Sequence, residues 1–102
     1  MTGVQTCALP ILIRAALRGD LATLQKLAKS KADLFVRNGD GRSGLIIGAL
    51  TKRPAIVAFF LNNRADVDAR DVYGYSALHY AAQNDHQAIA QMLLEHGASA
   101  QI

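Results

Sequence analysis

The side chains of this 102-residue chain that could support chemistry are few and widely spaced. Three histidines, His79, His86 and His96, are the first candidates for a metal site. Helical zinc sites commonly place two histidines four residues apart in an H-E-x-x-H pattern, and that spacing does not occur here. Histidines hydrogen-bonded to neighbouring groups are the commoner case. The sequence therefore predicts no metal site.

No catalytic arrangement is visible either. Asp66 and Asp68 are two residues apart in a segment expected to be exposed, where carboxylates solvate or cap the chain rather than act as an acid–base pair. A glycine-rich phosphate loop and a G-x-S-x-G turn are both missing from the sequence. The single cysteine, Cys7, excludes an internal disulfide and a cysteine-based zinc site. We expect no enzyme activity and no cofactor.

The composition is that of one folded domain. Hydrophobic residues make up 51% and charged residues 19%, with no tryptophan. The net charge of +3 permits acidic partners without pointing to nucleic acid. No apolar run approaches the roughly 20 residues of a membrane span, and no signal peptide is recognised. We expect a monomer; the compartment is unknown, and the cytoplasm is the default expectation.

A repeat of 33 residues organises the elements that carry these side chains. Shifting the chain by 33 superimposes Gly41 on Gly74, and it does the same for a series of further pairs: Ser43 and Ser76, Leu45 and Leu78, Ala49 and Ala82, Ile56 and Ile89, Leu61 and Leu94. A second shift carries Leu45 to Leu12 and Ala49 to Ala16. A fixed period of this size is typical of stacked repeats that bury their faces against one another.

Each unit contains a turn and two helices. In the third unit, residues 71–74 form the turn, because the Asp71 side chain can accept backbone N–H groups and Gly74 tolerates positive φ. Ser76 is the expected N-cap of a first helix that ends near Gln83. A second helix is expected from about His86 to His96. The inward face of the first helix is predicted to be Leu78, Ala81 and Ala82, and the apolar face of the second is predicted to be Ile89, Leu93 and Leu94. Of these, Leu94 is expected to be exposed, together with Met92, on a face that a further unit would cover.

The run from Gly74 to Ala82, followed by His86, the Leu93–Leu94 pair and Gly97–Ala98, resembles an ankyrin repeat. The resemblance covers residues 12–102 and implies an all-α solenoid of helix-turn-helix repeats joined by β-turn or hairpin connections. The expected units are about 12–37, 38–70 and 71–102. It also implies that His79 caps its helix and that His86 lies in the turn between helices. We expect the array to continue beyond this chain.

Several residues depart from the ankyrin pattern. In the second unit Gly44 replaces the usual proline and Ile46 the usual histidine, so the histidine hydrogen bond is expected to be missing there. Arg64, and Lys31 in the first unit, stand where a glycine normally ends the second helix, which predicts some backbone strain. Residues 1–11 match nothing in the repeat and resemble translated sequencing-adapter sequence, so we expect a non-native leader there.

The resemblance implies that turn tips and exposed first-helix positions bind another protein. The corresponding residues at the tips are Arg37, Asp40, Arg42, Arg70, Val72, Tyr73 and Tyr75, and those on the helices are Leu17, Arg18, Leu50, Thr51, Gln83 and Asn84. Tyrosine and arginine are enriched in binding hot spots, so we expect at least one of Tyr73, Tyr75 and Arg42 to anchor a partner.

Three functions remain open from the sequence. The first is a non-catalytic protein-interaction module. The second is the targeting or substrate-recognition part of a larger enzyme or secreted effector. The third, which the charge does not favour, is nucleic-acid binding through Arg37, Arg42 and Arg70; it predicts an affinity that falls steeply with salt.

Overall fold

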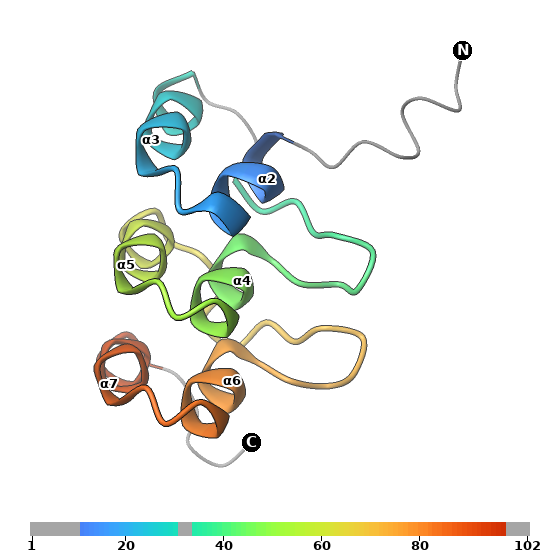
Figure 1. The fold of residues 1–102 in the computed structure, drawn as a ribbon, viewed down its shortest axis with the longest axis vertical. Coiled ribbons are helices and arrows are strands. Elements are labelled where there is room, and N and C mark those ends of the chain that lie inside the picture. The colour runs from blue at the N-terminus through green and yellow to red at the C-terminus, as the bar shows by residue number, and fades with distance from the viewer. Residues whose placement is uncertain (1–10, 31–33, 98–102) are drawn as a thin grey trace.

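The computed structural model describes residues 11–30 and 34–97. Six helices occur within these ranges: α2 (Ile11–Arg18), α3 (Leu21–Lys29), α4 (Gly44–Leu50), α5 (Pro54–Asn62), α6 (Ala77–Gln83) and α7 (Gln87–Glu95). Figure 1 shows α2, α4 and α6 stacked in one column and α3, α5 and α7 in a second. The described residues contain isolated bridges but no extended strand. The predicted all-α solenoid is confirmed.

Hairpins connect successive helix pairs. Antiparallel bridges pair Arg37 with Ser43 and Arg70 with Ser76, so the two hairpins close at corresponding positions of consecutive repeats. Both hairpins project to the same side, away from the column of α3, α5 and α7 (Figure 1). Gly41 and Gly74 adopt φ of 75° and 86° in these turns, a conformation that favours glycine. The repeat therefore places its two turn tips next to each other.

Polar side chains begin most of the helices. Ser43 and Ser76 accept hydrogen bonds from the backbone N–H groups of Ile46 and His79, as expected of N-caps. In return, Nδ1 of His79 accepts a hydrogen bond from the Ser76 backbone nitrogen at 2.9 Å. His86 is the N-cap of α7, and its Nδ1 lies 3.5 Å from the Ile89 nitrogen. The expected capping role of His79 is confirmed. His86 lies where the turn between α6 and α7 ends, as expected, and it also caps α7.

Three non-glycine residues occupy the left-handed region. Lys52 and Asp85 have φ of 61° and 55° in the turns between paired helices, where the first repeat has Gly19 with φ of 72°. Arg64, which follows α5, has φ of 66°. A left-handed conformation costs an L-residue roughly 1–2 kcal/mol, so the strain expected at Arg64 is present. The corresponding expectation for Lys31 lies outside the described residues, as do those for Cys7 and residues 1–10.

The helix pairs share one hydrophobic core. Leu45 is buried in it, and Leu78 packs against it half-buried, so both repeats contribute to the same cluster. One expectation about the third repeat is wrong: Ala82, predicted to face inward, is exposed. Leu94 is 47% exposed, as predicted. Their counterparts in the second repeat, Ala49 and Leu61, are buried because α6 and α7 pack over them. No described residue covers α6 and α7 in the same way.

Candidate protein-binding surface

Side-chain oxygens shape both hairpin tips from inside the turn. Oδ1 of Asp71 accepts hydrogen bonds from the backbone nitrogens of Tyr73 and Tyr75, each at 3.0 Å. Oδ1 of Asn38 accepts the equivalent bonds from Asp40 and Arg42, at 2.9 and 3.0 Å. Such Asx turns fix the backbone of a loop that has few other internal bonds. The expectation that Asp71 organises its turn is confirmed.

The Asp71 turn presents three large side chains to solvent. Val72 is 66% exposed, Tyr73 61% and Tyr75 47%. The Tyr75 ring also lies near two other rings, with centroid distances of 5.5 Å to His79 and 5.6 Å to Tyr80. The Tyr75 side chain is therefore held from one side while its other side remains accessible.

Arg42 lies in the seam between the second and third repeats. Its Nε is 3.3 Å from Oδ2 of Asp71, its Nη1 is 3.2 Å from Oδ2 of Asp40, and its Nη2 is 3.2 Å from the Tyr80 hydroxyl. The guanidinium carbon also lies 5.7 Å from the centroid of the Tyr73 ring and 5.5 Å from that of Tyr80. The side chain of Arg42 is thus engaged within the protein and supports the tip.

Asp71 is the buried charge of this seam. Its side chain has no exposed area, and the Tyr80 hydroxyl donates a hydrogen bond to Oδ2. Burial alone would favour the neutral acid, but the bonds from Tyr80, from the Tyr75 and Tyr73 amides and from Arg42 together hold the pKa of Asp71 below its ordinary value. Asp71 is therefore a carboxylate at neutral pH, neutralised by an arginine from the preceding repeat.

The pKa values of the two partners of Asp71, Tyr80 and Arg42, are shifted upward. Burial, and then the bond to Asp71, raise the pKa of the Tyr80 hydroxyl, so it stays protonated and donates. The bond with Tyr80 raises the pKa of Arg42, with a smaller contribution from Asp71. We name Asp71, Arg42 and Tyr80 the inter-repeat network.

Hydrogen bonds to backbone carbonyls also connect the second and third repeats. The Val72 nitrogen donates to the Asp40 carbonyl at 2.9 Å, joining the two tips directly. Nη1 of Arg37 donates to the carbonyls of Gly41, at 3.1 Å, and Arg70, at 2.8 Å. Gly41 allows this close approach, because a Cβ there would lie 3.1 Å from the Val72 nitrogen. The structure therefore brings Arg37, Asp40, Arg42, Arg70, Val72, Tyr73 and Tyr75 together at one pair of joined tips.

Gln83 and Asn84 lie apart from the tips. They end α6, whose first residue, Ala77, follows the hairpin directly. Gln83 is exposed, and the Asn84 side chain donates to the Leu50 carbonyl of the preceding repeat at 3.5 Å. These two residues extend the candidate surface along α6, where the Asn84 backbone nitrogen donates to the Tyr80 carbonyl at 2.9 Å.

Sequence reasoning missed Tyr80. The residue is 5% exposed and links Arg42 to Asp71, but the repeat pattern assigns no role to this position of the first helix. A signal was present, since the equivalent residue in the second repeat is Ile47, which is buried. A buried tyrosine generally needs a partner for its hydroxyl, and a charged partner was available 38 residues earlier in Arg42.

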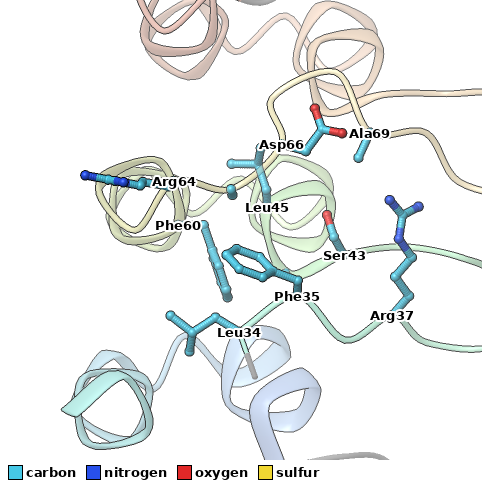
Figure 2. Close-up of a pocket in the computed structure, with 11 residues that line it drawn as sticks. Leu34, Phe35, Arg37, Ser43, Leu45, Phe60, Arg64, Asp66 and Ala69 are labelled. Carbon is cyan, nitrogen blue, oxygen red and sulfur yellow. The ribbon is translucent and has the colours of Figure 1, made fainter. Parts of the chain in front are cut away.

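A small apolar cavity lies on another side of the second repeat. It has a volume of about 170 Å³, and Figure 2 shows the rings of Phe35 and Phe60 beside Leu34 and Leu45 in its lining, with Arg37 at one side. Gly44 also lines it, and a Cβ on Gly44 would lie 2.1 Å from the Phe60 ring. The cavity is close in size to one that holds a benzene molecule, roughly 150 Å³. Of the predicted site residues, Arg37 alone reaches it.

Other kinds of site find no support in the part of the chain that the structure describes. Among residues 11–30 and 34–97, no group of three or more histidine, cysteine, aspartate or glutamate side chains could hold a metal ion. Within the same ranges, none of the helices has the length and apolar character that crossing a membrane requires.

The stacked helix pairs, with hairpin tips joined along one side, place the chain in the class of repeat solenoids. A family model described as ankyrin repeats in three copies matches residues 12–102. The chain belongs to the ankyrin repeat family. Ankyrin repeats are generally protein–protein interaction modules without catalytic activity.

Curated proteins support the same assignment. The chain is 40% identical over 67 residues to neurogenic locus notch homolog protein 2 of Homo sapiens, covering 66% of this chain and 3% of that protein. It is 33% identical over 91 residues to the RelA-associated inhibitor of Mus musculus, covering 89% of this chain and 11% of that protein. An ankyrin and IPT/TIG repeat-containing protein of Schizosaccharomyces pombe is 39% identical over 67 residues, covering 66% and 6%. The chain thus spans only a small part of each of these relatives.

Proposed function

We propose that this chain binds a partner protein through the joined hairpin tips, with Val72, Tyr73 and Tyr75 as the contact residues. The observation that carries the proposal is the exposure of three large side chains on a turn whose backbone is fixed from inside by a buried carboxylate. Exposed aromatic side chains on a preorganised loop lose little entropy on binding, and this makes them effective anchors.

The arginines of the surface have a supporting role in this proposal. All three guanidinium nitrogens of Arg42, and Nη1 of Arg37, already donate hydrogen bonds within the protein. A phosphate backbone is usually bound by arginine and lysine groups that are available to it. These contacts favour a protein partner over nucleic acid, with Arg70 and the helix residues Gln83 and Asn84 at the edge of the contact.

The proposal is tested by capture and cross-linking. A photo-reactive amino acid is placed at Tyr73 and, as a control, at Gln87. Gln87 is exposed on α7, in the column of α3, α5 and α7, which we call the outer helices. We expect a protein adduct from the Tyr73 position and none of the same mass from Gln87. Mass spectrometry then identifies the partner, and its affinity is measured with purified protein.

Substitutions then test the anchor residues. Tyr73→Ala combined with Tyr75→Ala should weaken binding by at least tenfold, because truncating hot-spot residues typically costs about 2 kcal/mol or more. Gln87→Ala should leave the affinity unchanged. Equal affinities for the wild type and the double variant would overturn the proposal. A steep loss of binding with rising salt, together with capture of nucleic acid, would instead favour nucleic-acid binding through Arg37, Arg42 and Arg70.

A further inference from the structure

Helix α5 lacks the polar face that an outer helix normally has. Its sequence, PAIVAFFLN, contains no charged residue and only Asn62 as a polar one. The outer helices on either side differ, because α3 carries Gln25, Lys26 and Lys29, and α7 carries Gln87, Gln91 and Glu95. A helix that is apolar all round is usually buried. On α5, however, Pro54, Ala55 and Asn62 are exposed.

A groove runs between α5 and α3 on this face. Its volume is about 720 Å³, and its lining comes from both helices: Leu21, Gln25, Ala28 and Lys29 on one wall, and Ala55, Ala58, Phe59, Asn62 and Asn63 on the other. Phe59 is buried at 8% exposure, and small alanine side chains leave the space above it open. The groove lies in the column of outer helices, which is the column farther from the hairpins in Figure 1.

The charge bordering this groove has one sign. Lys29 lines it, Lys26 is on the same helix, and neither α3 nor α5 contains an acidic residue. Neither lysine forms an ion pair with another residue in the described ranges. The acidic residue nearest α3 in sequence is its N-cap, Asp20, whose carboxylate accepts bonds from Thr23 and does not line the groove. The groove therefore complements a ligand that is apolar in the middle and acidic along one edge.

We propose that the α3/α5 groove binds an amphipathic helix of a partner protein, with its apolar side chains over Phe59 and its acidic side chains beside Lys29. The two helices that form the walls are nine residues each, or about 13 Å long, so the groove accommodates two to three turns of a bound helix. Anchors at i, i+3 or i+4 and i+7 present such a face. This surface is separate from the hairpin tips, so one chain can hold two partners at once.

The test selects helical peptides against the full chain. A display library of two- to four-turn helices is panned on the wild type, with counter-selection on Ala55→Glu, which adds bulk and negative charge to the groove wall. The matched control is Ala88→Glu, at the same position of α7, which is exposed and lies outside the groove. Circular dichroism confirms that both variants fold.

Enriched peptides should carry apolar residues at helical spacing and aspartate or glutamate on one flank. Their dissociation constants should rise at least tenfold with Ala55→Glu, severalfold with Lys29→Glu, and stay unchanged with Ala88→Glu. Absence of enrichment, a consensus without helical spacing, or equal binding to Ala55→Glu would overturn the proposal. Sedimentation in which the wild type dimerises and Ala55→Glu does not would overturn it too, because the face would then bind a second copy of this chain.

Discussion

The second and third repeats carry the same residues at several positions but bury them differently. Leu61 is 6% exposed and Leu94, 33 residues later, is 47% exposed. Ala49 is fully buried and Ala82 is exposed. The second repeat lies between two helix pairs, whereas the third is covered by described residues on one side alone. In a stacked repeat, burial is thus a property of the neighbour as much as of the residue.

The two repeats also fill the space between their paired helices with different side chains. Ala77 in the third repeat packs into a core that contains Leu93, while the second repeat has Gly44 and the larger Phe60 at the equivalent positions. The Phe60 ring occupies the space that a side chain on residue 44 would need. The departure of Gly44 from the ankyrin pattern is therefore compensated 16 residues later in the same repeat.

The largest single loss of stability is expected at the turn residue Asp71, which we compare with its counterpart Asn38. Asp71→Ala should lower the free energy of unfolding by about 3–4 kcal/mol, because it leaves Arg42 and Tyr80 without their buried partner. Asn38→Ala removes the same kind of Asx turn without a buried charge and should cost about 1–2 kcal/mol. Urea unfolding followed by circular dichroism measures both. Equal losses would show that the inter-repeat network adds nothing beyond the turn.

Truncation of the paired leucines tests the dependence on neighbours. Leu61→Ala should cost about 2–4 kcal/mol, as expected for a buried leucine, and Leu94→Ala less than about 1 kcal/mol. The same unfolding measurement applies. A loss at Leu94 as large as that at Leu61 would mean that the third repeat is covered on both sides in solution.

The compensation between Gly44 and Phe60 can be measured with a double-mutant cycle. Gly44→Ala alone should destabilise the protein by about 1–3 kcal/mol, because the new methyl group overlaps the Phe60 ring. Adding Phe60→Leu, which recreates the pair found in the third repeat, should recover at least half of that loss. Strictly additive effects would contradict the compensation.

Replacing a strained residue by the glycine of its counterpart should stabilise the protein. Arg64 and Gly97 both follow an outer helix with positive φ, 66° and 94° respectively. Arg64→Gly should raise the free energy of unfolding by about 1 kcal/mol, since glycine adopts this conformation without steric cost. Differential scanning calorimetry would detect the increase in melting temperature, and a decrease would show that the Arg64 side chain contributes more than its backbone costs.

The smallest expected difference is in the response to acid. The pKa of Asp71 is lower in the folded chain than its ordinary value, so its stabilisation is present above the unfolded pKa and is lost as pH falls through the folded one. Between about pH 5 and pH 3, which spans the ordinary aspartate value near 3.9, the wild type should lose stability more steeply than Asp71→Asn. Parallel curves would assign the acid sensitivity to other carboxylates, such as Asp20, whose pKa is also lowered by its bonds to Thr23.

Local patterns in the sequence were enough to predict the helices, the serine caps and the Asp71 turn. Each depends on residues within a few positions of one another, where propensity and hydrogen bonding decide the structure. The inter-repeat network could not be placed in this way, because Arg42 lies 29 residues from Asp71 and 38 from Tyr80. The α3/α5 groove was likewise missed, since it depends on the spacing of two helices. The exposure of Leu94 was predicted, whereas Ala82 was wrongly expected to face inward because its residue type matches that of its buried counterpart, Ala49.

The inter-repeat network divides one neutral unit between two repeats, with the cation in the second and the carboxylate in the third. A genetic exchange that breaks the chain between Arg42 and Asp71 would therefore separate a charge from its counter-charge, even though it respects the 33-residue period. Chimaeras that graft the third repeat onto a foreign array need an arginine 29 positions before the aspartate. Recombination that preserves the inter-repeat network therefore has to transfer the second and third repeats together.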